Sequence, residues 1–119
     1  MNEDMLTIES EATLRDAAQR MSERNAGAAL VMGPPDGYGP WILTERDVLN
    51  SVAAGQDPDG QRVADNVTTE VVTVSVDAAR EQAMKKMTEG DFRHLLVVQG
   101  DNTVGIVSMR DIVRGLTSQ

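Results

Sequence analysis

The sequence predicts an α+β protein made of two β-α-β-β-α repeats that pack against each other as a pseudo-two-fold pair. Three observations support this fold class. The chain repeats itself at a nearly constant spacing, and each copy has the same order of short strands and amphipathic helices. Each copy also has only about fifty residues, which is marginal for independent folding, so the two copies must share their buried surface.

The internal repeat is found when the sequence is compared with itself at a shift of 66 residues. The matched pairs at this shift include Thr7 with Thr73, Ile8 with Val74, Met21 with Met87, and Leu30 with Leu96. After residue 40 the shift becomes 64, and the matched pairs include Ile42 with Ile106, Thr44 with Ser108, and Asp47 with Asp111. We therefore expect a first repeat over residues 1–54, a linker and lead-in turn over 55–66, and a second repeat over 67–119.

The first repeat opens with a short strand and an amphipathic helix. Residues 6–8 are apolar and partly β-branched, which predicts the strand. Thr13 and Asp16 have the spacing of a capping box, which predicts that a helix begins just after Thr13. Asn25 and Gly27 are residues that end helices. The apolar face of this helix consists of Leu14, Ala17, Ala18 and Met21.

Two further strands and a second helix complete the first repeat. The strands are expected over residues 28–32 and 41–43, on either side of the turn-rich stretch 33–40. The helix is expected from Thr44 onward. Its apolar positions are Val48, Leu49 and Val52.

The second repeat follows a polar linker over residues 55–60 and a predicted single helical turn over 63–67. The stretch 100–102, Gly-Asp-Asn, has residues typical of a hairpin turn. The predicted elements are a strand over 71–74, a helix with the apolar face Ala79, Ala83, Met84 and Met87 closed by Gly90, strands over 95–98 and 104–107, and a closing helix from Ser108.

The composition limits the classes of partner. Nineteen acidic against eleven basic residues give a net charge of −8, which argues against nucleic acid and against anionic membranes as partners. The chain has no cysteine, so disulfides and thiolate metal sites are excluded. The sequence has no segment typical of a secretory leader and no apolar run of membrane-spanning length, so we expect a cytoplasmic protein.

Enzymatic chemistry finds little support in the residue types present. A single histidine and no cysteine leave few pairings of a nucleophile with a base. The sequence contains no Gly-rich phosphate loop followed by Lys-Ser/Thr, and no histidine–carboxylate cluster with metal-ligand spacing. We therefore expect a protein that is not an enzyme, with no catalytic residue, no metal site and no required cofactor.

Three segments resemble a known repeat. Residues 105–112 are similar to the signature Gly-hydrophobic-hydrophobic-Ser/Thr-x-x-Asp-hydrophobic that closes a CBS (cystathionine-β-synthase-type) repeat. Residues 41–48 resemble it too, except that Trp41 stands where glycine is usual. Residues 93–98 resemble the middle strand of the family. The resemblance extends over residues 5–116, so the chain is identified as a member of the tandem CBS-pair, or Bateman-module, proteins.

This resemblance implies a regulatory module that signals to a partner protein, still unidentified. Its cleft would bind AMP, ADP, ATP or another adenosyl compound. In the family, the Asp of the closing motif binds the ribose hydroxyls, and the Ser or Thr lies near the ribose or phosphates. The adenine packs against the first strand of the opposite repeat, and basic residues on the middle strand face the phosphates. An ionised carboxylate suits a diol because it accepts charge-assisted hydrogen bonds.

The resemblance assigns these roles to two clefts that are unequal. Asp111 is expected to bind the ribose, while Arg93 and His94 are expected to face the phosphates. The matched positions in the first repeat are Gly27 and Ala28, which carry no charge, so the cleft with Asp111 is expected to bind nucleotides better. The candidate ligand-binding residues are Asp111, Ser108, Arg93, His94 and Ile106 with Thr7 and Ile8 in that cleft, and Asp47 and Thr44 with Thr73 and Val74 in the other.

Each of these residues also has a purely structural interpretation. Thr44-x-x-Asp47 and Ser108-x-x-Asp111 both fit the helix N-terminal capping pattern, and capping and ligand binding can coexist. His94 also fits a half-buried position on a strand. Trp41 is more typical of a packing anchor than of a platform for base stacking.

Three hypotheses concern the function of the whole module, and one concerns its oligomeric state. The chain is either a ligand sensor or a non-binding scaffold for dimerisation, and a third possibility is a piece of an enzyme whose catalytic part lies on another chain. A homodimer is expected because CBS pairs usually associate through their helices. A second reason is that six apolar helix residues exceed what one three-stranded sheet in each repeat can cover. These residues are Ala17, Ala18, Met21, Ala83, Met84 and Met87.

Overall fold

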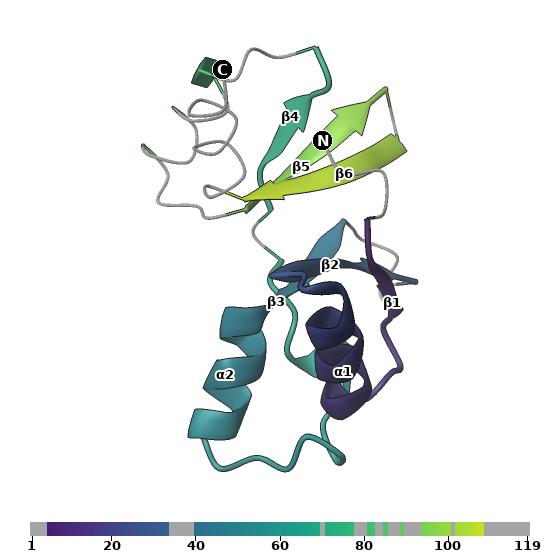
Figure 1. Cartoon of the computed structure of the whole chain (residues 1–119), viewed down its shortest axis with the longest axis vertical. Coiled ribbons are helices and arrows are strands. Elements are labelled where there is room, and N and C mark those ends of the chain that lie inside the picture. Colours follow the sequence, from purple (N-terminus) through teal and green to yellow (C-terminus); the bar gives the residue numbers. More distant parts are fainter. Residues whose placement is uncertain are drawn as a thin grey trace. The chain divides into compact units, whose positions relative to one another are not determined.

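The structure is a computed structural model that describes residues 5–33, 40–69, 71–77, 81, 82, 85, 89, 94–100 and 102–108. The chain divides into two compact units (Figure 1). The first-repeat unit comprises Leu6–Val71, and the second-repeat unit comprises Val72–Gln119 together with Met1–Met5. Each unit contains one three-stranded sheet with both parallel and antiparallel pairing, and the two described α-helices belong to the first-repeat unit. The predicted α+β class is therefore confirmed.

The sheet of the first-repeat unit has the order β1-β2-β3. Its strands are β1 (Thr7–Glu9), β2 (Ala28–Met32) and β3 (Trp41–Thr44). β1 is parallel to β2, while β2 is antiparallel to β3. A parallel pair needs a crossover connection, and the helix between β1 and β2 supplies it. The predicted strands are present, with ends that differ by one residue where they differ at all.

Two helices cover this sheet, α1 (Leu14–Arg24) and α2 (Glu45–Ala53), and Figure 1 shows both on the same side of it. Thr13 is the N-cap of α1, and its hydroxyl accepts a hydrogen bond from the Asp16 N–H at 3.1 Å. Asn25 ends α1 in the left-handed conformation, with φ of 53°. The predicted start and end of this helix are confirmed because the capping residues act locally.

The core of the first-repeat unit contains the apolar face of α1. Its buried members are Leu6, Ile8, Leu14, Ala17, Met21, Ala29, Val31, Leu43 and Val63. Trp41 packs against this cluster, in agreement with the packing interpretation. Of the six helix residues cited for a homodimer, Ala17 and Met21 are buried within their own unit and Ala18 is half-buried, while Ala83, Met84 and Met87 lie outside the described residues, so the homodimer stays a prediction. Among the described residues, the exposed large apolar side chains are Leu49 (57%) and Val52 (51%) on α2 and Met32 (49%) on β2.

The predicted linker is hydrogen-bonded to the start of α1. The carbonyl of Gln61 accepts from the Leu14 N–H at 2.9 Å, and the carbonyl of Pro58 accepts from the Arg15 N–H at 3.3 Å. Arg15 also forms an ion pair with Asp59, and this hydrogen bond and the nearby charge raise the pKa of the Arg15 guanidinium. The carbonyls of Gln61 and Pro58 thus satisfy N–H groups that a helix start leaves unpaired.

The predicted helical turn after the linker is a short 3₁₀ helix, η1 (Val63–Asp65). Val63 is fully buried in the core of the first-repeat unit, and its N–H donates to the Ala12 carbonyl at 2.8 Å. Linker and turn thus belong to the compact unit that ends at Val71. The repeat boundaries at 54 and 67 stay a prediction.

The second-repeat unit contains β4 (Thr73–Ser75), β5 (His94–Gln99) and β6 (Asn102–Ser108) in the order β4-β5-β6. β4 is parallel to β5, and β5 is antiparallel to β6, as in the first repeat. Gly100 has φ of 62° in the tight turn between β5 and β6, a conformation that favours glycine. The helices predicted from Ala79 and from Ser108 lie largely outside the described residues.

Within the described ranges, neither α1 nor α2 has the length and apolarity needed to cross a membrane.

Candidate functional site

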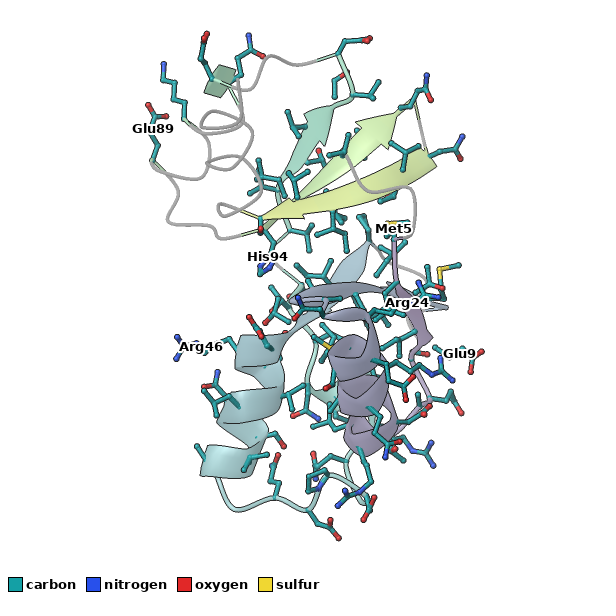
Figure 2. All side chains as sticks on the ribbon, viewed as in Figure 1. Met5, Glu9, Arg24, Arg46, Glu89 and His94 are labelled. Atoms are coloured by element: carbon teal, nitrogen blue, oxygen red, sulfur yellow. The ribbon has the colours of Figure 1, made fainter. Side chains whose placement is uncertain are left out.

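The second repeat places His94 directly opposite Ser108. Their Cα atoms are register partners at the end of the antiparallel β5–β6 ladder, where β5 begins and β6 ends (Figure 2). Directly opposed residues point their side chains to the same face, with Cβ atoms about 4.5–5.5 Å apart. Both residues are half-buried. The structure therefore brings together the imidazole and the hydroxyl that the sequence assigned to one cleft.

Ile106 lies on the same face of this sheet. It is the register partner of Leu96, which lies two residues after His94, and side chains two residues apart on a strand share a face. Thr73 of β4 is also paired with Leu96 and is exposed. The face therefore carries a polar end at His94 and Ser108 and an apolar centre at Leu96 and Ile106.

The first repeat has the same register with different side chains. Ala28 is opposite Thr44, where the second repeat has His94 opposite Ser108. The carbonyl of Gly27 accepts a hydrogen bond from the Glu45 N–H at 3.0 Å and so helps to begin α2. Neither Gly27 nor Ala28 brings a charge.

Thr44 and Asp47 form a complete capping box at the start of α2. The Asp47 N–H donates to the Thr44 hydroxyl at 3.2 Å, and the Thr44 N–H donates to Asp47 Oδ2 at 2.8 Å. The structural interpretation of this motif is thereby confirmed. The carboxylate is a half-buried acceptor at a helix N-terminus, where the helix dipole favours negative charge.

The Asp47 carboxylate has a second partner, Thr68. The Thr68 hydroxyl donates to Asp47, and its oxygen lies 3.0 Å from Oδ1 and 2.9 Å from Oδ2. Backbone hydrogen bonds hold the same segment on β3, because the Thr68 N–H donates to the Ile42 carbonyl at 2.8 Å and the Ile42 N–H donates to the Thr68 carbonyl at 3.2 Å. Both Asp47 and Thr68 are half-buried.

Arg46 lies inside this motif, between Thr44 and Asp47 in sequence. Figure 2 shows its side chain pointing outward from the start of α2, and the residue is exposed. Its guanidinium is therefore directed toward solvent in this structure.

The first strand of each repeat carries one buried and one exposed residue of the predicted site. Ile8 is 1% exposed in the core of its unit, whereas Thr7 is exposed. The Leu6 carbonyl and the Ser10 N–H bond to β2, so by strand alternation the Thr7 backbone groups point to the outer edge of β1. In the second repeat Val74 is likewise buried and Thr73 exposed. Within each predicted pair, the threonine is the residue with an exposed side chain.

Two predicted site residues, Arg93 and Asp111, lie outside the described residues. Their assignment to the phosphates and the ribose stays a prediction. A search of the described part of the chain finds no group of three or more His, Asp or Glu side chains that could hold a metal ion.

Thr68 is the site residue that sequence reasoning missed. It stands 21 positions from Asp47 and outside the motifs of either repeat. The sequence shows that a capping carboxylate has unused acceptor capacity, but no local pattern identifies the donor that uses it.

Comparison with known proteins gives relatives that match most of this chain. It is 32% identical to the CBS domain-containing protein YhcV of Bacillus subtilis over 114 residues, which is 94% of this chain and 79% of that protein. It is 32% identical to the mitochondrial CBS domain-containing protein CBSX3 of Arabidopsis thaliana, over 90% of this chain. The chain spans about half, 54%, of that plant protein.

Solved structures with the same fold agree. A protein with CBS domains from Burkholderia ambifaria has a TM-score of 0.87 at 29% identity, covering 98% of this chain and 85% of the other. A hexameric CBS-CP12 protein from bloom-forming cyanobacteria has a TM-score of 0.85 at 30% identity, covering 95% and 63%. The CBS domain protein PAE2072 from Pyrobaculum aerophilum, solved with AMP, has a TM-score of 0.81 at 24% identity, covering 100% and 95%.

The family model for the CBS domain matches twice, over residues 1–54 and 63–118. These two matches coincide with the internal repeat and with the two three-stranded sheets of matching strand order. The chain belongs to the CBS domain family and carries two CBS domains in tandem.

Proposed function

We propose that this CBS pair is a sensor that binds an adenine nucleotide or another adenosyl compound and signals its presence to a partner protein. The observation that carries the proposal is the His94–Ser108 pair, a cation-forming side chain and a hydroxyl placed on one face of β5 and β6. PAE2072, a protein of the same fold, was solved with AMP, which supports the choice of an adenine nucleotide as ligand.

The proposed site assigns one task to each side chain. Asp111 accepts hydrogen bonds from the ribose diol, which are strong because the acceptor is charged. Arg93 and His94 face the phosphate, and Ser108 lies beside the ribose or phosphate. Thr7 and Ile8 contribute the strand against which the adenine packs, and the apolar Ile106 lines the base.

Charge supports this cleft over the one that contains Asp47. A phosphate in a protein of net charge −8 needs local positive charge, because the surrounding field repels it. Arg93 and His94 supply that charge in the second repeat, whereas Gly27 and Ala28 occupy the matched positions in the first. The cleft of Thr44 and Asp47 with Thr73 and Val74 is therefore the weaker nucleotide site.

The module acts by binding, without catalysis, in the cytoplasm. The tasks proposed for its side chains are hydrogen bonding and charge pairing, which fix a ligand without breaking its bonds. The regulated protein would respond to a change in the CBS pair that the bound nucleotide stabilises.

A thermal-shift panel of AMP, ADP, ATP, S-adenosylmethionine, NAD and GTP tests the proposal. A ligand at a hundredfold excess over its Kd adds about 2.7 kcal/mol to the free energy of unfolding. We expect at least one adenosyl ligand to do so in the wild type, and its effect to shrink in Ser108→Ala. Thr103→Ala, which removes a hydroxyl near the other end of β6, is the matched control. If none of the six ligands raises Tm, the proposal fails.

A second candidate function, a scaffold that self-associates, has one observation in its favour. Leu49 and Val52 place two half-exposed apolar side chains on α2. The cyanobacterial CBS-CP12 protein is hexameric, which supports self-association in proteins of this kind. Light scattering should give the mass of two chains for the wild type, and Leu49→Gln with Val52→Gln should shift it toward one chain. A wild-type mass of one chain at micromolar concentration rules out the homodimer.

A further inference from the structure

We infer that Thr68 is an internal competitor for the Asp47 carboxylate, so that the cleft of the first repeat binds a ribose only by displacing the Thr68 hydroxyl. The competition rests on the function proposed above. The hydrogen bond between Thr68 and Asp47 lies within the first-repeat unit and can be tested without any ligand.

The geometry of the hydroxyl carries this inference. The Thr68 oxygen lies 3.0 Å from Asp47 Oδ1 and 2.9 Å from Oδ2, nearly equidistant from both. A point equidistant from both oxygens lies in the plane that bisects the carboxylate. A vicinal diol that donates one hydrogen bond to each oxygen must approach across the same plane. The threonine hydroxyl and a ribose diol that binds both oxygens therefore compete for the same two acceptor atoms.

The remaining acceptor capacity of Asp47 does not relieve this conflict. Oδ2 also accepts the Thr44 N–H at 2.8 Å, and that bond belongs to the capping box that begins α2. The diol cannot replace the Thr44 bond without loosening the helix start. Thr68 is the partner that can leave, because its hydroxyl is on a half-buried side chain that can turn toward water.

The hydrogen bond between Thr68 and Asp47 also affects the segment that joins the two repeats. Thr68 is held on β3 by its backbone bonds with Ile42, and β4 begins shortly afterwards at Thr73. Displacing the hydroxyl removes the side-chain part of this attachment. Occupancy of the Asp47 cleft is thus coupled to the stability of the connection between the two CBS domains.

The second-repeat unit, which includes Met1–Met5, has a different residue at the position that matches Thr68. The 66-residue shift matches it with Asn2, which has a side-chain amide in place of a hydroxyl. Asn2 and the matched carboxylate, Asp111, both lie outside the described residues. The competition is therefore inferred for the Asp47 cleft alone, on the contacts that the first-repeat unit shows.

The test compares Thr68→Val with Thr69→Val. Valine keeps the volume and β-branching of threonine and removes only the hydroxyl, and Thr69 is an exposed neighbour that serves as the matched control. In ligand-free protein, amide hydrogen exchange is measured at Ile42 and at residue 68. We expect Thr68→Val to speed exchange at both amides about tenfold, the equivalent of one hydrogen bond to a charged group, and Thr69→Val to leave them unchanged.

Calorimetry with AMP provides the second measurement. Thr68→Val should bind AMP at the Asp47 cleft about tenfold more tightly than the wild type, or show a second binding event that the wild type lacks. Weaker binding by Thr68→Val means that Thr68 is itself a ligand group and overturns the inference. Equal binding by both variants and the wild type also overturns it, while leaving the proposed function intact.

The two measurements separate the possible failures. If no variant binds AMP or the other nucleotides of the panel, the proposed function fails and the competition fails with it. Hydrogen exchange then still tests whether the hydrogen bond between Thr68 and Asp47 holds the segment on β3. Unchanged exchange at Ile42 in Thr68→Val shows that the hydroxyl does not hold the segment, whatever the calorimetry gives.

Discussion

Ala28 stands opposite Thr44 in the first repeat, and His94 stands opposite Ser108 in the second. The strands, their order and their register are the same in both places, so the backbone frame is not what distinguishes the two clefts. The difference lies in the side chains that the frame carries. In the first repeat no cation stands at the matched position, and the closing-motif Asp is engaged by its own helix cap and by Thr68.

This difference shows how a duplicated unit can divide its tasks. The Thr44-x-x-Asp47 motif caps α2 in the first copy, and the matched Ser108-x-x-Asp111 pattern predicts the same for the second. Only a copy that also has a cation beside the motif can hold an anionic nucleotide well. We therefore interpret the first copy as mainly structural and the second as the principal ligand site.

The largest expected effect is on nucleotide affinity. Asp111→Ala removes the proposed partner of the ribose diol, and loss of a hydrogen bond to a charged group lowers affinity about ten- to a hundredfold. Asp47→Ala should leave most of the affinity. Titration calorimetry with AMP measures both, and equal losses, or a greater loss in Asp47→Ala, would show that the comparison is wrong.

The next effect separates the phosphate from the rest of the ligand. His94→Ala should weaken AMP binding about tenfold, because it removes one proposed hydrogen bond to a charged phosphate. Adenosine has no phosphate and should bind wild type and variant alike. A parallel loss for adenosine and AMP would place His94 against the nucleoside instead.

A smaller effect concerns stability at Asp47 and at Asp16, the aspartates at the third position of α2 and of α1. Asp47→Ala removes a reciprocal cap and the bond to Thr68, which should lower the free energy of unfolding by about 1.5–3 kcal/mol. Asp16→Ala is the matched control at the same position of α1. Its carboxylate forms an exposed ion pair with Arg20 at 3.2 Å, worth about 0.3–0.5 kcal/mol.

Urea unfolding followed by tryptophan fluorescence measures these costs. Trp41 is the only tryptophan and lies on β3 of the first repeat, so its signal reports on this unit. If the two variants lose the same stability, the bond between Thr68 and Asp47 contributes nothing measurable.

The order of elements in the first repeat could be predicted from sequence because its signals are local. The caps at Thr13, Asn25 and Thr44 act within one helical turn, and the alternation of apolar residues marks the strands. In the second repeat the same signals located β5 and β6. The pairing of His94 with Ser108 did not follow from the hairpin turn, because a register shift between Val97 and Val98 moves the earlier pairs by one residue.

Contacts between distant positions could not be predicted. Thr68 reaches Asp47 across 21 residues, and the linker carbonyls of Pro58 and Gln61 reach the start of α1 from more than 40 residues away. Such contacts depend on how the chain packs, which no short pattern encodes. For the same reason the sequence did not show that Ala17 and Met21 of α1 are buried in their own unit while Leu49 of α2 is exposed.

The smallest effect on stability is expected at the ion pair between Arg15 and Asp59, which also attaches the linker after the first repeat. Its two side chains are 55% and 60% exposed, so water and salt screen the attraction. The linker also keeps its backbone bonds from Leu14 to Gln61 and from Arg15 to Pro58 when the charge is removed. Asp59→Asn should therefore shift Tm by no more than about 2 °C, and less at about 1 M salt. Thermal unfolding at low and high salt checks this. A loss of stability as large as that of Asp47→Ala would show that the exposed ion pair, rather than the half-buried hydrogen bond between Thr68 and Asp47, holds the segment after the first repeat.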